Sequence, residues 1–163
     1  MKTILRATIV NNYRSQTPRG FYSRIKGHTG TDFRYQFEEL PSPVSGKVIF
    51  TAHQSEMGNV MYVEDSLGSI HVFAHLSEFV KKLGDKVTRN EIIAKTGNSG
   101  SKTTSPHLHY EIITNRPYRK IPDSLMSRSL GGFKGYNTNP VQYLKDLYFK
   151  YHVDLDGNLI TNI

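Results

Sequence analysis

The sequence contains no cysteine and no tryptophan among its 163 residues. Without thiols no disulfide can form, and every metal site that uses thiolate ligands is excluded. Any transition metal must therefore be held by histidine and carboxylate side chains. No apolar stretch approaches the roughly 20 residues that a membrane-spanning helix needs, so we expect no membrane span.

What the chain does contain is typical of one globular domain. Hydrophobic residues make up 37% and charged residues 21%, which argues against a disordered chain. The net charge of +7 makes an anionic partner plausible, such as nucleic acid, an anionic cell-wall polymer or an acidic membrane, and charge alone does not choose among them. Met1–Arg6 begins no apolar run long enough for a signal peptide, so we expect that nothing in this chain exports it.

The most informative stretch is 105–114, in which two histidines sit two residues apart within a β-branched and aromatic run. That composition predicts a strand, and a strand places His107, His109 and Glu111 on one face. The two imidazoles would then lie roughly 6 to 7 Å apart along the chain. One metal could take one imidazole and leave the other free for proton chemistry, although the pattern equally fits an ordinary polar strand face.

Two further stretches carry histidines. His28 and Asp32 are four residues apart in a segment rich in glycine and threonine, and at this spacing both can ligate one cation. The same residues also fit a loop histidine and a turn aspartate. In 69–76, apolar residues alternate with polar ones, which predicts a strand with its apolar set toward the core and with His71 and His75 on the outer face.

The second half of the chain predicts a long connection followed by a helix. Residues 115–139 are basic and glycine-rich, and we expect them to form a loop that walls a groove. Apolar residues then recur at helical spacing from Val141 to Tyr151.

Considered together, six segments in this order resemble the lysostaphin-type zinc endopeptidases, also called the LytM or M23 family. The resemblance runs from about Gly27 to Leu144. The matching segments are Gly27-His28-Thr29-Gly30-Thr31-Asp32-Phe33, Pro43-Val44-Ser45-Gly46-Lys47-Val48, Ala74-His75-Leu76-Ser77, Gly84-Asp85-Lys86-Val87, Gly97-Asn98-Ser99-Gly100 and Pro106-His107-Leu108-His109-Tyr110-Glu111.

The resemblance implies a role for each site residue. His28, Asp32 and His109 would be the ligands of one Zn²⁺ per chain, and His75 and His107 the catalytic pair. Catalytic zinc indeed takes three protein ligands and keeps one position open. The chain lacks the pattern His-Glu-x-x-His, so histidine would take the part of the usual glutamate base.

Some details depart from the family pattern or fit it only loosely. In relatives a tyrosine upstream of the first zinc histidine can stabilise the oxyanion, and Tyr22 is the best-placed candidate here. The position two before His75 is commonly tyrosine, whereas this chain has Phe73, so any hydroxyl role there is lost. Glu111 is either a partner that orients a ligand or an ordinary polar strand residue.

The family fold is mainly β, with a central antiparallel sheet that forms the floor of a groove walled by loops (a barrel-sandwich hybrid) and few short helices. We expect one such domain over 1–163, with its core at about 20–144 and a helix and hairpin extension at 145–163. The resemblance implies a peptidase that cleaves peptide cross-links or stem peptides in bacterial peptidoglycan.

Partners and location follow from the same resemblance. We expect peptidoglycan and anionic wall polymers as partners and no nucleic acid, because the basic residues are dispersed and match no nucleic-acid module. The protein would act in the cell wall or periplasm. A small enzyme without a signal peptide resembles phage or prophage lysins. We therefore expect it to be virion-associated, released by a holin or otherwise delivered. The alternative is a non-catalytic module of the same fold that binds the wall or activates an amidase.

Overall fold

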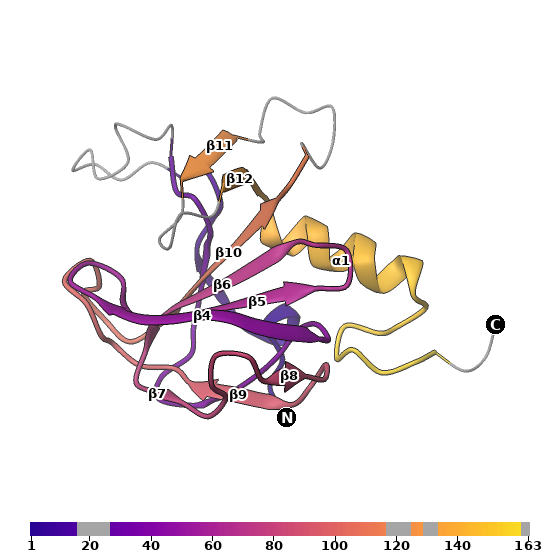
Figure 1. Cartoon of the computed structure of the whole chain (residues 1–163), viewed down its shortest axis with the longest axis horizontal. Helices are drawn as coiled ribbons and strands as arrows, with labels where there is room; N and C mark the ends of the chain where they lie inside the picture. Colours follow the sequence, from indigo (N-terminus) through magenta and orange to yellow (C-terminus); the bar gives the residue numbers. More distant parts are fainter. Residues whose placement is uncertain (16–26, 117–124, 129–133, 161–163) are drawn as a thin grey trace.

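The computed structural model describes residues 1–15, 27–116, 125–128 and 134–160, and it is dominated by antiparallel strands (Figure 1). The mainly β fold with few helices that the sequence predicts is therefore confirmed. The elements are η1 Ile4–Arg6, β1 Ile9–Asn11, β2 Thr31–Phe33, β3 Glu39–Pro41, β4 Gly46–Gln54, β5 Gly58–Asp65, β6 Ile70–Leu76, β7 Glu78–Phe79, β8 Lys86–Val87, β9 Ile92–Lys95, β10 Leu108–Thr114, β11 Leu125–Arg128, β12 Lys134–Thr138 and α1 Pro140–Lys150.

The described strands form two antiparallel sheets. The large sheet has the order β1-β2-β10-β6-β5-β4-β8, and the small sheet has the order β3-β9-β7. One edge of β10 pairs first with β2 and then with β12, while its other edge pairs with β6. This pairing makes β10 the strand on which segments from the two halves of the chain meet.

The large sheet is packed on both of its faces. The larger core cluster contains Met61, Phe73, Leu108 and Tyr110, together with residues of the small sheet and of α1. The second cluster lies on the opposite face and contains alternate residues of the same strands, namely Val60, Tyr62, Ile70, Val72, Ala74 and Ile113. Strict alternation along β5 and β10 supplies both clusters, as expected for strands that are covered on both sides.

Strand β6 departs from this alternation near its end. Asn59 and Met61 of β5, which are two residues apart, pair with Leu76 and Phe73 of β6, which are three apart. The extra residue is a β-bulge, and His75 within it adopts a left-handed backbone conformation with φ of 60°. A bulge turns a side chain away from the face that alternation would give it.

The prediction that His71 and His75 share an outer face of β6 was wrong, because the large sheet is covered on both faces and the bulge turns His75 to the side opposite His71. His71 is fully buried, since its ring lies between Tyr110 and Tyr143 in the larger core. Its Nδ1 lies 2.6 Å from Tyr110 Oη, and its Nε2 lies 3.0 Å from Asp65 Oδ2. His71 and His75 therefore point to opposite faces of the sheet.

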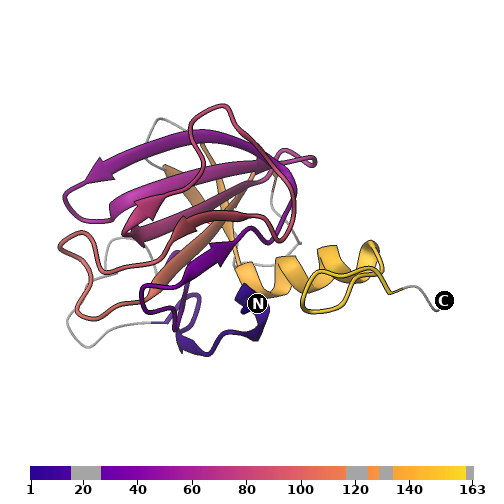
Figure 2. The ribbon, with the colours of Figure 1, turned by 90° about the horizontal axis from the view of Figure 1, so that it is seen from below.

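Helix α1 is tied to the sheet by polar contacts as well as apolar ones. The Asn139 side chain caps the helix by accepting from the backbone N–H groups of Val141 and Gln142. Tyr143 Oη donates to Asp65 Oδ2 at 3.0 Å, so the helix joins the buried network around His71. Figure 2 shows the helix extending away from the sheet, with the C-terminal segment running back beside it.

The long connection after β10 is only partly a loop. Within the expected loop of 115–139, β11 and β12 form a hairpin whose second strand pairs with β10. The rest of the expected groove wall, at 117–124 and 129–133, lies outside the described residues. No helix in the described part of the chain has the length and apolarity needed to cross a membrane.

Candidate metal and catalytic site

The three predicted metal ligands meet at the junction of β2 and β10. Asp32 and His109 are direct partners in the β2–β10 pairing, and His28 lies in the turn that precedes β2. His28 Nε2 lies 3.0 Å from His109 Nδ1 and 3.2 Å from Asp32 Oδ1, and His109 Nδ1 lies 2.8 Å from Asp32 Oδ1. One atom of each side chain therefore converges on a single point.

The donor set fits a zinc ion. Ligand bonds of about 2.0 to 2.2 Å in tetrahedral geometry place ligand atoms about 3.3 to 3.6 Å apart, so the observed separations of 2.8 to 3.2 Å need an expansion of less than about 1 Å. Two imidazoles and one carboxylate are also the combination found in catalytic zinc sites that keep an open position. All three residues are buried, so the site is partly shielded from bulk water.

The atoms that face away from this point have partners of their own. His28 Nδ1 lies 3.0 Å from the carbonyl oxygen of Asn12, and His109 Nε2 lies 2.8 Å from Glu111 Oε1. Asp32 Oδ2 accepts from the amide of Asn11 at 3.2 Å. Such contacts fix the tautomer and the orientation of metal-ligating side chains. Glu111 thus orients His109, which decides between the two interpretations that its position on the strand left open.

Asp32, His109 and their neighbours shift one another's pKa values. Burial on its own would raise the pKa of Asp32, but hydrogen bonds from His109 and His28 outweigh it and hold that pKa well below the usual range. Burial would likewise lower the pKa of His109, but Asp32 and Glu111 raise it to about 10. The negative potential of the two carboxylates therefore attracts a positive charge to the centre of the cluster.

His75 reaches the same face because of the β6 bulge. Its ring centroid lies 4.8 Å from that of His107 and 6.1 Å from that of His109. Its Nδ1 donates to the carbonyl oxygen of Ser99 at 2.8 Å, which leaves Nε2 as the acceptor. Burial lowers the pKa of His75 to about 4, the Ser99 carbonyl opposes that shift, and the positive charges of His109 and His107 add to it.

The loop that carries Ser99 is held against the β4–β5 hairpin. Ser99 Oγ donates to the carbonyl of Leu76 at 2.6 Å and accepts from the backbone N–H of Asn59 at 2.9 Å. Gly58, with φ of +66°, packs directly on Ser99, where a Cβ atom would lie 2.4 Å from the carbonyl oxygen. The anchor of His75 thus depends on close backbone packing that only glycine permits.

His107 is held in a similar way one residue before β10. Its Nδ1 donates to the carbonyl oxygen of Ser105 at 2.8 Å, and its Nε2 faces Asp32 Oδ1 at 3.7 Å. Each of the two histidines thus has Nδ1 bound to a backbone carbonyl. The three predicted metal ligands and the two predicted catalytic histidines therefore lie together at one end of one sheet face.

Two other expectations concern tyrosine hydroxyls. Tyr22 lies outside the described residues. Phe73 is fully buried in the larger core, where it stacks on Tyr110 at 5.1 Å, so it points away from the site face.

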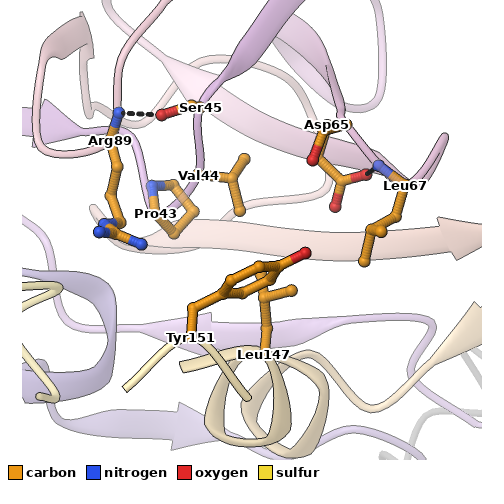
Figure 3. Close-up of a pocket in the computed structure, with 9 residues that line it drawn as sticks. Pro43, Val44, Ser45, Asp65, Leu67, Arg89, Leu147 and Tyr151 are labelled. Atoms are coloured by element: carbon orange, nitrogen blue, oxygen red, sulfur yellow. Dashed lines mark hydrogen bonds between the residues drawn. The ribbon is translucent and has the colours of Figure 1, made fainter. Parts of the chain in front are cut away.

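The candidate site is separate from the cavity shown in Figure 3. That cavity, of about 180 Å³, lies between Pro43–Ser45, the turn at 65–67, Arg89 and the end of α1. None of the predicted metal or catalytic residues lines it.

Sequence reasoning missed the contribution of Asn11 and Asn12. An Asn-Asn pair fits a turn, and nothing in it predicts which carbonyl or amide will face a metal site. The signal that links them to the site is the pairing of Asn11 with Asp32 across β1 and β2, which is visible only in the structure.

Comparisons with known proteins agree with the fold and identify the family. Residues 26–120 match the model of peptidase family M23. The peptidoglycan DD-endopeptidase ShyA of Vibrio cholerae is 35% identical over 94 residues, which are 55% of this chain and 21% of that protein. The chain thus spans about a fifth of the length of this curated relative.

Solved structures extend the similarity to most of the chain. The catalytic domain of the antimicrobial peptidase lysostaphin from Staphylococcus simulans superposes with a TM-score of 0.66 at 25% identity, covering 85% of this chain and 92% of that domain. A zinc-containing peptidase from Vibrio cholerae superposes with a TM-score of 0.57 at 30% identity, covering 65% and 33% of the two chains. The resemblance seen in the sequence is confirmed, and the chain belongs to peptidase family M23.

Proposed function

We propose that this chain is a zinc-dependent endopeptidase that hydrolyses peptide bonds in bacterial peptidoglycan. The observation that carries the proposal is the convergence of His28 Nε2, Asp32 Oδ1 and His109 Nδ1 within 3.2 Å of one another, with two more imidazoles beside them. The choice of peptidoglycan rests on the peptidoglycan DD-endopeptidase that the chain resembles.

His28, Asp32 and His109 would hold the zinc ion, with one ion per chain. Bound there, zinc supplies a Lewis acid and lowers the pKa of water to about 7, so that a nucleophile forms at neutral pH. The buried positions of the ligands limit competing water, and Asn11, Asn12 and Glu111 keep the ligand atoms aimed inward.

His75 and His107 would carry out the proton transfers. Burial holds the pKa of His75 near 4, so at neutral pH its Nε2 is free to accept a proton from the attacking water. His107 has Nδ1 bound to Ser105, and its Nε2 is directed at the site, where a protonated imidazole could stabilise the oxyanion or donate to the leaving amine. Both rings lie on the face of β10 that carries His109.

The chain would act as a single domain. Ile4 near one end and Tyr148 and Val153 near the other belong to the same core cluster as the central strands, which supports this view. Action in the cell wall or periplasm follows from the proposed substrate. Delivery by a phage or virion and the binding of anionic wall polymers stay predictions, as does the oxyanion role of Tyr22.

The test combines metal analysis with cleavage. Elemental analysis of the purified protein should give one zinc per chain, and His109→Ala should lose zinc and activity together. Incubation with purified peptidoglycans of different cross-link chemistry, followed by mass spectrometry of the released fragments, should identify the bond that is cut. A protein that binds zinc but releases no fragment from any of these substrates would support the non-catalytic alternative.

A further inference from the structure

Two consecutive residues outside the matched family segment contact two of the three proposed zinc ligands. Asn11 and Asn12 precede residue 26, where the family match begins. The Asn11 amide donates to Asp32 Oδ2 at 3.2 Å, and the Asn12 carbonyl lies 3.0 Å from His28 Nδ1. Strand β1 therefore ends at the site, and its last residue, Asn11, and the following Asn12 contact the ligands directly.

The register of the strands puts Asn11 in this place. Asn11 and Asp32 are paired across β1 and β2, and residues that are direct partners in an antiparallel pair project their side chains to the same face. Asp32 and His109 are partners across the next strand pair. Asn11, Asp32 and His109 thus form a row across three adjacent strands.

The chemistry of the contact sets the orientation of the Asn11 amide. When Asp32 serves as a metal ligand its carboxylate is deprotonated, so both of its oxygens can only accept hydrogen bonds. Nδ2 must therefore face Asp32, while the amide oxygen faces the hydroxyl of Ser15. With Oδ2 held by this donor, Oδ1 is the oxygen left to point at His28 and His109.

We propose that Asn11 is a positioning residue that sets the zinc affinity of the site by holding Asp32 as a ligand through one oxygen. This inference rests on the proposed function, because it requires that His28, Asp32 and His109 bind zinc. The neutral amide orients the carboxylate without cancelling its charge, so the attraction for the cation is kept. Loss of such an orienting contact typically weakens metal binding about 10- to 100-fold.

A purely structural role for Asn11 would give a different result. Asn11 also belongs to the β1–β2 ladder, and its backbone bonds there do not depend on the side chain. If the side chain served only to pack the sheet edge, its removal would lower the thermal stability of the metal-free protein and leave zinc affinity unchanged.

The experiment compares Asn11→Ala with the control variant Val10→Ala on the same strand. Zinc dissociation constants are measured by competition with a chromophoric chelator, and thermal unfolding of the metal-free proteins is recorded in parallel. Asn11→Ala should bind zinc about 10- to 100-fold more weakly, because the donor to Asp32 is lost. Val10→Ala should bind like the wild type, because the exposed valine side chain has no hydrogen-bond donor to offer Asp32.

A second variant separates hydrogen-bond donation from side-chain size. Asn11→Leu keeps a similar side-chain size and adds no charge but removes the donor, so its affinity should fall about as far as that of Asn11→Ala. Wild-type affinity in Asn11→Ala or in Asn11→Leu would overturn the role of Asn11 as a donor.

The wild-type protein and His109→Ala show which proposal has failed. If the wild type binds one zinc and His109→Ala does not, the metal site stands and the result for Asn11 is judged on its own. If the wild type binds no zinc, both the proposed function and this inference are wrong.

Discussion

Substituting Gly58 tests whether the 97–100 loop aims His75. Gly58 has φ of +66°, and a Cβ atom there would lie 2.2 Å from Ser99 Oγ and 2.4 Å from the Ser99 carbonyl oxygen. Ordinary contact begins near 3.4 Å, so Gly58→Ala must displace that carbonyl by about 1 Å. The displaced group is the acceptor of the His75 Nδ1–H.

The expected loss follows from that displacement. Misplacing a catalytic group by about 1 Å can cost roughly 10²-fold in rate. The zinc ligands lie on other segments, so the zinc content should stay at one per chain. Stability should fall by at least the roughly 1 to 2 kcal/mol that a left-handed alanine costs, which lowers Tm by about 2 to 8 °C for a chain of this size.

Gly84 provides the matched control. Its φ is +92°, so alanine there pays a similar backbone cost, but a Cβ atom would meet nothing within 4 Å. Gly84→Ala should therefore lose stability while keeping the wild-type rate of peptidoglycan cleavage, which is followed by the fall in turbidity of a cell-wall suspension. If Gly58→Ala does not fold, Ser99→Ala replaces it, because that change removes the two hydrogen bonds of Oγ and leaves the backbone free of clashes. A folded, zinc-loaded Gly58→Ala or Ser99→Ala with wild-type turnover would refute the argument that this loop positions His75.

Three further predictions concern the proposed catalytic pair and the buried network that Tyr143 of α1 joins. His75→Ala and His107→Ala should each retain zinc and lose about 10²- to 10⁴-fold in cleavage rate, and a variant that loses zinc by elemental analysis would instead be identified as a ligand mutant. Tyr143→Phe removes a hydrogen bond to a buried carboxylate and should lower the free energy of unfolding in urea by about 1 to 3 kcal/mol, whereas an unchanged midpoint would mean that the bond contributes nothing net. Burial would raise the pKa of Asp65, but its bond from His71 and those from backbone N–H groups hold it below the ordinary value. The stability from Asp65 is therefore present above pH 4 and lost as the pH falls through the folded pKa, so Asp65→Asn should show a weaker decline of stability in acid than the wild type.

The part of the site that the sequence could predict is the part that depends on strand alternation. His109 and Glu111 share a face of β10 because they are two residues apart, and the structure places them in hydrogen-bond contact. That His28 and Asp32 meet His109 of β10 could be expected only from the family resemblance, because a spacing of four residues in a glycine-rich turn does not determine where the side chains point. Their atoms do meet those of His109 in the structure.

The expected loop at 115–139 shows where composition misleads. Glycine and basic residues argue against a buried strand, yet β11 and β12 form a hairpin there and β12 extends the edge of β10. Only β11 lies at the edge of this hairpin, where polar and charged residues are tolerated, whereas β12 is flanked by β10 and β11 and buries Asn137 and Thr138. Sequence propensity alone cannot separate a polar edge hairpin from a loop.

The opposite orientations of His71 and His75 show why alternation fails at this site. Both were expected on one face, because an even spacing in a regular strand keeps side chains on the same side. In a regular β6, His75 would follow His71 and Phe73 into the larger core, where an imidazole could not reach His107 or His109. The single extra residue in β6 reverses the direction of His75, at the expense of a left-handed conformation that a non-glycine residue adopts only when its surroundings enforce it. Those surroundings are the bonds of His75 to the Met57 carbonyl through N–H and to the Ser99 carbonyl through Nδ1. The left-handed backbone of His75 and the close packing at Gly58 therefore act together: they direct the His75 side chain away from the core and toward the proposed zinc site.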